Sequence, residues 1–237
     1  MSGPAPTWSP PCRVCEPEWM DDPTLSADRH VAALRGLERI NRLSGTAKAI
    51  AADLTSVPPT PRVVFDVGCG GGDVTIDVAR RIRRRSPQTR VIGGDRSPRA
   101  VEYAQARARR AGVPVEFVVF DAATDPWPSG VEAIVSSLFL HHLPDDAIGP
   151  FLRRCVESEA GRVVMIDLER SPRGLALARW GTRALSRCDV VHHDGPQSVR
   201  AAFTVEELRD SAEANGLSGA DVRRTWPARL LLTWWRR

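Results

Sequence analysis

Residues 62 to 73 have the sequence Arg-Val-Val-Phe-Asp-Val-Gly-Cys-Gly-Gly-Gly-Asp, an apolar run that ends in a glycine-rich loop. A short apolar run bounded by glycine predicts a strand buried on both faces. Gly68, Gly70 and Gly72 allow the backbone to turn sharply and to approach a ligand closely. The helix predicted from Val74 to Arg85 would present free N–H groups and a partial positive charge to a carboxylate. The loop therefore predicts a site for a nucleotide-like ligand.

Strands and helices alternate on both sides of this loop. Further strands are predicted at residues 90–94, 115–120, 131–138 and 162–168. Helices are predicted at residues 98–111 and 145–156, and a final strand pair at 221–226 and 229–235. This alternation is typical of parallel sheets covered by helices on both faces. We expect an α/β fold, a Rossmann-like doubly wound sheet of seven mostly parallel strands.

The rest of the chain is predicted to extend this sheet within one domain, residues 26–237. Before it, residues 1–25 are rich in proline and lack periodicity, which predicts a flexible N-terminal arm. The apolar residues Val31, Leu34, Leu37 and Ile40 recur at three-residue steps and predict an amphipathic helix. We divide the domain into four parts. They are an N-terminal helical cap (26–60), a core (61–170), an insertion after strand five (171–203) and a C-terminal helix with the strand pair (204–237). The insertion is predicted to cover the substrate that accepts the transferred group, and we call it the acceptor lid.

Composition is that of an ordinary globular protein. The chain has 237 residues, of which 42% are hydrophobic and 26% charged. No apolar run is long enough to span a bilayer. Residues 1–11 lack the apolar core and positive flank of a secretory signal. We therefore expect a cytoplasmic enzyme without a membrane span.

The net charge of +4 comes almost entirely from arginine, because the chain holds a single lysine, Lys48. Such a bias reflects either the base composition of the gene or an anionic partner. The arginine-rich run at residues 80–85 falls at the end of a predicted helix, where positive charge is stabilising. No aromatic residues stand between these arginines to stack on bases, so we do not expect this run to bind nucleic acid. Cys12 and Cys15 form a lone CxxC pair without further ligands at short spacing, so no metal site is predicted.

Acidic residues in and around this loop distinguish it from the glycine loop of a dinucleotide-binding protein. The dinucleotide pattern requires a third small residue where this chain has Asp73. Asp66 precedes the loop on the first strand and is placed to accept a hydrogen bond from an ammonium group. Asp95 follows the next strand and can accept hydrogen bonds from ribose hydroxyls, and Asp121 follows the third and can accept one from an adenine amino group. Taken singly, each of these acids could instead cap a helix. Because all three stand at the ends of successive strands, a shared ligand site is favoured.

From about Arg62 to Leu168 the chain resembles the class I S-adenosylmethionine-dependent methyltransferases. The resemblance implies S-adenosyl-L-methionine as the cofactor. Its methionine part would be held by Asp66 and by four residues of the glycine loop: Gly68, Cys69, Gly70 and Gly72. The ribose would be bound by Asp95, and the adenine would lie beside Arg96, Asp121 and Ala122. Ser137 and Leu138 would lie below the sulfonium.

The fourth predicted strand leads into Ser137-Leu-Phe-Leu-His-His-Leu143. The Asn/Asp-Pro-Pro-Tyr/Phe motif of enzymes that methylate nucleobase or glutamine nitrogens is absent from this place, and so is a Pro-Cys nucleophile. The string is similar to that of ubiquinone/menaquinone-biosynthesis-type methyltransferases, the small-molecule branch. This resemblance implies a small phenolic, quinol or lipid-like acceptor.

Histidines supply the candidate general bases, because an imidazole accepts a proton near neutral pH. His141 and His142 follow the fourth strand, and His193 lies next to Asp194 in the predicted lid. The alternative for His141 and His142 is packing beside the cofactor, as the resemblance implies. For His193 the alternative is a polar turn that ends at Gly195-Pro196.

The sequence thus predicts a methyltransferase for a small, largely apolar acceptor, with a phenolic, quinol or polyketide-like oxygen as the expected target. Two alternatives stay open: an RNA methyltransferase, suggested by the basic composition, and a non-catalytic protein that binds S-adenosylmethionine. The acceptor atom and the oligomeric state are left undetermined.

Overall fold

The computed structural model describes residues 12–22 and 24–236, and within them seven strands form one sheet. The strand order is β3-β2-β1-β4-β5-β7-β6. The strands are β1 (Val63–Val67), β2 (Arg90–Asp95), β3 (Glu116–Val119), β4 (Ala133–Ser137), β5 (Arg162–Leu168), β6 (Asp221–Thr225) and β7 (Arg229–Trp235). Neighbours pair in parallel except β7, which is antiparallel to both β5 and β6. The predicted doubly wound, mostly parallel sheet is confirmed.

Helices cover both faces of the sheet, and each face has its own apolar core. Helices α2 (Thr46–Leu54), α3 (Asp73–Arg83) and α4 (Pro98–Ala111) pack on one face, with buried side chains such as Ile50 and Ile82. Helices α5 (Asp145–Glu157) and α8 (Val205–Ala214) pack on the other, around Leu152 and Leu208. Because β1, β4 and β5 are buried on both faces, their sequences are continuous apolar runs rather than alternating ones.

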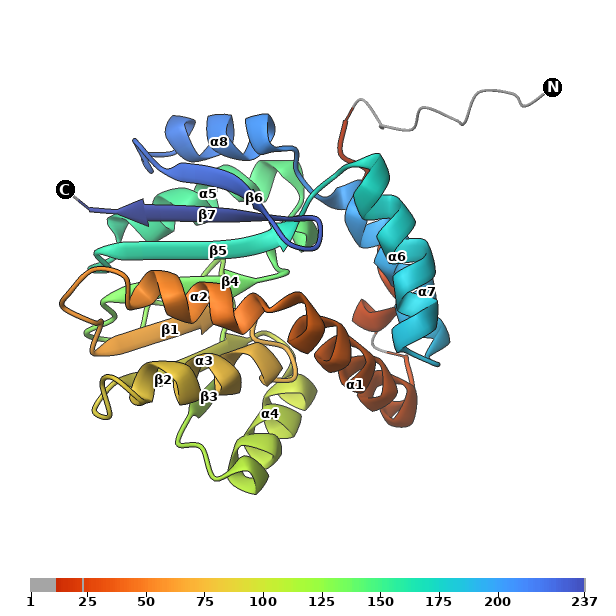
Figure 1. Cartoon of the computed structure of the whole chain (residues 1–237), viewed down its shortest axis with the longest axis horizontal. Helices are drawn as coiled ribbons and strands as arrows, with labels where there is room; N and C mark the ends of the chain where they lie inside the picture. The colour runs from red at the N-terminus through yellow and green to blue at the C-terminus, as the bar shows by residue number, and fades with distance from the viewer. Residues whose placement is uncertain (1–11, 23, 237) are drawn as a thin grey trace.

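A third group of helices lies beyond the edge where the parallel strands end (Figure 1). It comprises α1 (Ala27–Ser44), α6 (Pro172–Leu185), α7 (Asp189–Ala201) and the short 3-10 helix η1 (Trp19–Asp21). Helix α1 contacts both α6 and α7, and α7 contacts η1. Leu25, Ala33, Val190 and Val191 form the small apolar cluster between them. These helices therefore face the end of the sheet at which α/β proteins bind ligands.

Residues 12–22, the N-terminal segment, pack against this helical group. The Val14 amide donates to the Arg200 carbonyl at 3.1 Å, and the Arg13 guanidinium donates to the Ala201 carbonyl at 2.7 Å. Arg13 also stacks over the Phe203 ring, 4.1 Å from its centroid. These contacts correct the expectation of a flexible arm for residues 12–22; residues 1–11 lie outside the described part.

Helix α8 starts as its sequence predicts. The Thr204 hydroxyl accepts from the Glu207 amide at 3.2 Å, and the Glu207 carboxylate accepts from the Thr204 amide at 2.9 Å. This reciprocal capping box satisfies two donors that the first turn of a helix otherwise leaves free. Across the described ranges, none of the helices combines the length and apolar character needed to cross a bilayer.

Candidate active site

The loops that carry the predicted site residues meet at one edge of the sheet, the edge that faces α1, α6 and α7 (Figure 1). Asp66 lies one residue before the end of β1, and Asp95 ends β2. Ser137 ends β4, and Asp167 lies one residue before the end of β5. Parallel pairing brings these strand ends together, so groups from four loops share one site.

Asp66 is a buried carboxyl group with one oxygen unused. Only 1% of the residue is exposed, and its Oδ2 accepts from the Thr75 hydroxyl at 2.6 Å. Its Oδ1 has no hydrogen-bond partner among the described residues. Burial raises the pKa of Asp66 to about 7, and the nearby carboxylates of Asp73 and Asp95 act in the same direction. The hydrogen bond from Thr75 lowers the pKa but does not outweigh them. A buried carboxyl with a vacant acceptor oxygen suits a cationic donor such as an ammonium group.

The glycine loop leaves room above its middle residue. Gly70 has a φ of 50°, and a Cβ added to it, unlike one added to the other loop glycines, would meet no atom within 4 Å. At Gly72, with a φ of 71°, a Cβ would lie 2.7 Å from the Phe117 ring, so glycine is required by packing. Cys69 precedes Gly70, and its side chain is buried in the core. A ligand therefore finds space over Gly70, while Cys69 contributes packing.

Asp95 ties the second strand to the glycine loop. Its Oδ2 accepts from the Gly70 amide at 2.8 Å, and its Oδ1 accepts from the Ser97 amide at 2.9 Å. A carboxylate oxygen has two lone pairs, so each oxygen keeps one for a further donor such as a hydroxyl. Arg96, next in the chain, is exposed and lies close enough to Asp21 to lower the pKa of that carboxyl.

Asp121 closes its own turn. Its Oδ1 accepts from the Ala123 amide at 2.8 Å, and its own amide donates to Asp125 Oδ2 at 2.9 Å. The side chain is exposed, and the neighbouring Ala122 packs against the apolar core. These contacts close a turn between β3 and β4 rather than cap a helix.

The chain leaves β4 through a strained residue. Leu138 has a φ of 57°, a left-handed conformation that costs a side chain with a Cβ about 1 kcal/mol or more. Its amide donates to the Ile166 carbonyl of β5 at 2.8 Å, which holds the turn in place. This turn leads directly into the 3-10 helix η2 (Leu140–His142), which presents the two histidines.

His141 is buried and held by Asp167. Its residue is 4% exposed, and its Nδ1 lies 2.6 Å from Oδ1 of Asp167. Asp167 also accepts from the amides of His141 at 3.2 Å and Leu168 at 2.6 Å. Although burial alone would raise it, the pKa of Asp167 is lowered by His141 and these donors. An ionised Asp167 accepts the Nδ1–H bond, which leaves the Nε2 lone pair of His141 available.

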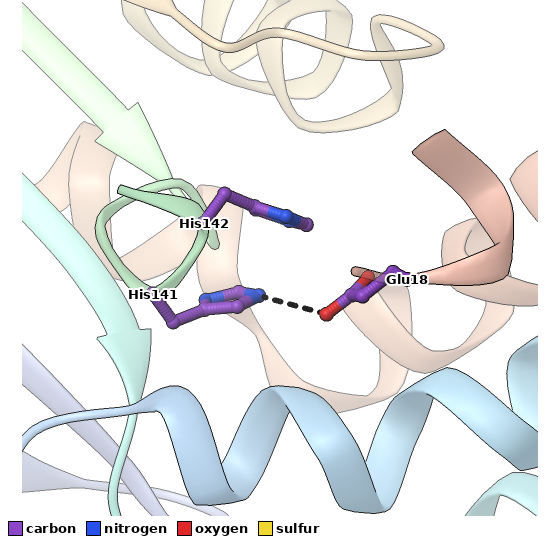
Figure 2. A group of neighbouring side chains, drawn as sticks. All are labelled: Glu18, His141 and His142. Atoms are coloured by element: carbon purple, nitrogen blue, oxygen red, sulfur yellow. Dashed lines mark ion pairs between the residues drawn. The ribbon is translucent and has the colours of Figure 1, made fainter. Parts of the chain in front are cut away.

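Two acidic residues of the N-terminal segment face the histidines, and Figure 2 shows one of them, Glu18. Glu18 Oε1 lies 3.9 Å from His141 Nε2, and Asp21 Oδ2 lies 3.6 Å from His142 Nδ1. The two imidazole rings lie beside each other with centroids 4.2 Å apart. Burial alone would lower the pKa of His142, but Asp21, helped by Glu18 and Asp167, raises it to about 9.

Comparisons with known proteins agree with this geometry. Residues 64–158 match the family model described as a methyltransferase domain. An uncharacterised methyltransferase of Mycobacterium bovis is 27% identical over 186 residues, which cover 75% of this chain and 89% of the relative. The ubiquinone biosynthesis O-methyltransferase of Ralstonia nicotianae is also 27% identical, over 71% of this chain and 68% of its own length. The plantazolicin methyltransferase BpumL, solved in complex with SAH, shares the fold with a TM-score of 0.67 and 13% identity over 92% of this chain and 93% of its own.

The chain carries a methyltransferase domain and is an S-adenosylmethionine-dependent methyltransferase that resembles the class I enzymes. Its cofactor is S-adenosyl-L-methionine, and the resemblance to the small-molecule branch is confirmed. The residues present fit that cofactor, because Asp66 Oδ1 lacks a donor among the described residues and the space over Gly70 is open.

His193 contacts the N-terminal segment of the methyltransferase. His193 lies within helix α7, so the predicted polar turn at Gly195-Pro196 is wrong. Its ring stacks on Trp19 with centroids 3.9 Å apart, and its Nδ1 lies 2.9 Å from Asp194 Oδ1. Asp194 in turn accepts from the amides of Trp19 and Met20, both at 3.0 Å. These contacts give His193 a role in holding the N-terminal segment, and the structure does not group it with His141 and His142.

Three residues of the site were missed by sequence reasoning. Asp167 stands near the end of β5, and the rule that singled out the acids after the first three strands would have found it. Glu18 sits in a stretch without periodicity, so nothing in the sequence marks it. Arg229, at the start of β7, is 3% exposed and donates to Asn41 Oδ1 at 3.2 Å and to the Thr46 hydroxyl.

Arg229 belongs to a buried network at the start of α3. Asn41 Nδ2 donates to Asp73 Oδ2 at 3.0 Å, and Asn41 Oδ1 accepts from Arg229. Burial lowers the pKa of Arg229 to about 10, with Asp167 and Asp73 acting in the opposite direction. Asp73, too large for a dinucleotide loop, is therefore used to join α1 and α3.

Proposed function

We propose that this methyltransferase transfers its methyl group to an oxygen of a small, largely apolar acceptor: a phenol, a quinol or a polyketide-like hydroxyl. The observation that carries the proposal is the pair of His141 and Asp167, 2.6 Å apart at the carboxyl end of β4 and β5. A phenol is a weak nucleophile until it loses its proton, and histidine can accept that proton near neutral pH. When bound, the cofactor supplies an activated methyl carbon.

We assign the cofactor-binding residues by position along the strand ends. Asp66 with Gly68, Gly70 and Gly72 would hold the methionine part, with Asp66 Oδ1 accepting from its ammonium group. Asp95 would accept from ribose hydroxyls with its remaining lone pairs. The adenine would lie by Arg96, Asp121 and Ala122, and the sulfonium above Ser137 and Leu138. Cys69 supports this loop through its buried side chain.

His141 is our candidate for the general base, and Asp167 is the residue that positions it. The Asp167 carboxylate holds the proton on Nδ1, so that Nε2 accepts the proton of the acceptor hydroxyl. The resulting imidazolium is stabilised by the ionised Asp167 beside it. His142 lies next to His141 and faces Asp21, which makes it a polar wall of the site rather than the base.

Exclusion of water is the second contribution of the chain. Methyl transfer requires the acceptor oxygen to lie in line with the breaking bond, and much of the rate comes from this alignment in a closed site. We propose that residues 171–203, together with α1 and the N-terminal segment, form the acceptor lid. The name of the Ralstonia nicotianae relative, a ubiquinone biosynthesis O-methyltransferase, supports an oxygen of a quinol-like ring as the acceptor.

The test is methyl transfer from labelled S-adenosylmethionine to a panel of phenols and quinols. We expect labelled product with at least one member, and a loss of about 10²-fold or more in kcat for His141→Gln. His192→Gln, which changes a histidine that contacts the Ser186 carbonyl, is the matched control and should keep most of the activity. Binding of S-adenosylhomocysteine without transfer to any acceptor would leave a non-catalytic binding protein. A salt-dependent gel shift with tRNA or rRNA, followed by label in the RNA, would establish the RNA alternative instead.

A further inference from the structure

Three nitrogen and oxygen ligands converge where the N-terminal segment meets η2. Glu18, His141 and His142 each offer one ligand atom, and these atoms all lie within 4.8 Å of one another. Figure 2 shows the Glu18 carboxylate pointing at the edges of the two imidazole rings. The three residues come from two segments more than a hundred positions apart, so only the folded chain assembles them.

His141 is prepared as a metal ligand by the residue behind it. Histidines that bind metals usually donate their other ring N–H to a carboxylate, which fixes the ring and makes the ligating nitrogen more basic. Asp167 supplies this contact at 2.6 Å, on the side of the ring opposite Glu18. The His141 side chain is 3% exposed, and its Nε2 lies 3.9 Å from Oε1 of Glu18.

Glu18 is also held in place, although it belongs to the N-terminal segment. Its side chain is 9% exposed, and its Oε1 accepts from the Ser198 hydroxyl of α7 at 2.5 Å. A separation of 3.9 Å from His141 Nε2 is too long for a hydrogen bond. Two ligands on one zinc ion, each at about 2.0–2.2 Å, would lie about 3.3 Å apart, so a small side-chain movement would bring both onto one ion.

The charges around the cluster favour a cation. Three carboxylates, those of Glu18, Asp21 and Asp167, face the two imidazoles. Arg13 donates to the carbonyls of His141 and Leu143 and pairs with Asp145, and Arg96 lies close to Asp21. A divalent ion would offset this local excess of negative groups.

We propose that Glu18, His141 and His142 form a binding site for a divalent first-row transition metal ion of the zinc type. Imidazole nitrogens suit zinc, iron and nickel, whereas magnesium and calcium prefer oxygen ligands. Three protein ligands leave at least one coordination position open, as in catalytic rather than structural zinc sites. The ion would join the N-terminal segment to η2. It would occupy the Nε2 lone pair of His141, so a bound ion would prevent His141 from accepting a proton as the proposed function requires.

The test is a zinc titration of the full-length chain by calorimetry, after purification without a histidine tag and removal of metals with a chelator. We expect one zinc ion per chain, with affinity at least tenfold weaker in both Glu18→Gln and His142→Gln. His192→Gln changes a neighbouring histidine of α7 that contacts the Ser186 carbonyl rather than the N-terminal segment, and it should bind zinc as the parent does. Equal affinity in the parent and both cluster variants, or no zinc binding at micromolar concentration, would overturn the proposal.

Cys12 and Cys15 could bind zinc by themselves, so the titration is repeated with the Cys12→Ser/Cys15→Ser double variant. Undiminished binding there supports the proposed cluster, whereas its loss assigns the zinc to the cysteines and overturns the proposal. Cobalt substitution adds a readout that does not depend on activity, because thiolate ligands give an intense near-ultraviolet band that His and Glu ligands do not. Methyl transfer assayed separately with and without chelator reports on the proposed function, which can therefore fail or stand independently of the metal site.

Discussion

Asp167 and His141 are 26 residues apart in the sequence, yet Oδ1 of one lies 2.6 Å from Nδ1 of the other inside the protein. The carboxylate is itself held by two backbone amides, so it presents a fixed acceptor to the ring. This contact sets which nitrogen of His141 faces the acceptor side, and the chemistry proposed for the site depends on it.

Replacement of Asp167 by Asn tests this relationship. The amide keeps the size of the carboxylate but loses the charge that stabilises an imidazolium, so we expect kcat to fall by about 10²-fold. The pH profile of kcat should shift as well, which a merely structural role would not produce. The measurements are initial rates across pH and calorimetric affinity for S-adenosylhomocysteine, and the latter should change less than threefold. A proportional loss of cofactor affinity and rate would instead indicate damage to the fold.

Cofactor affinity should depend on pH through Asp66. The pKa of this carboxyl is about 7 in the free protein, and an ammonium group beside it favours the ionised form. Below pH 7, binding therefore releases a proton. As the pH rises, the Kd for S-adenosylhomocysteine should fall by up to about tenfold per pH unit, and it should level off near pH 7. Calorimetry from pH 5.5 to about 7.5 checks the slope, and Asp66→Asn should bind weakly with no slope.

The same carboxyl should limit the stability of the cofactor-free protein. Because the folded-state pKa of Asp66 lies above its ordinary value of 3.8, its favourable contribution is complete below that value and is lost as the pH rises through about 7. Asp66→Asn should therefore stabilise the free protein at pH 8 by on the order of 2 kcal/mol, about 4–8 °C in Tm. Thermal unfolding at pH 8 and pH 5 compares the two proteins; a benefit that is equal or larger at pH 5 would contradict the assignment.

Asn41 should be important for stability despite its small size. Its side chain bridges Asp73 and Arg229, and its removal leaves both buried groups short of a partner. We expect Asn41→Ala to lower the free energy of unfolding by about 2–3 kcal/mol, as measured by urea denaturation. Asn215→Ala is the matched control, because Asn215 also makes two side-chain hydrogen bonds but near the surface at the end of α8. A cost at Asn215 as large as at Asn41 would argue against a special role for the buried network.

Leu138 should separate stability from activity. Its φ of 57° suits glycine, so Leu138→Gly should be more stable than Leu138→Ala by about 1 kcal/mol, since alanine keeps the strain. If Leu138 lines the site as proposed, both variants should lose methyl transfer to a similar extent. Urea denaturation and initial rates measured on the same preparations give the two comparisons. Full activity in either variant would remove Leu138 from the site.

Much of the core was predictable because its signals are local. The buried strands are mainly apolar, and single residues mark some helix ends, such as Gly112 after α4 and the N-cap Thr204 before α8. Helix α7 was missed because its middle, His192-His193-Asp194-Gly195-Pro196, carries the residues typical of a turn. Its apolar residues Val190, Val191 and Val199 are buried against α1 and its neighbours, and this packing outweighs the weak helix propensity of Gly195 and Pro196.

The sequence alone established that a parallel sheet ends in a glycine loop flanked by acids, and hence that the chain binds an adenosyl cofactor. The positions of the strands, of the loop and of the acids that follow the strands are all marked by patterns within a few residues of each other. The tertiary structure alone decided what stands opposite the cofactor loop. Asp167 reaches His141 across 26 positions and Glu18 reaches Ser198 across 180. The apolar spacing of α1 predicts a helix, but no local pattern in the chain says which helices it packs against or which side chains that packing brings together.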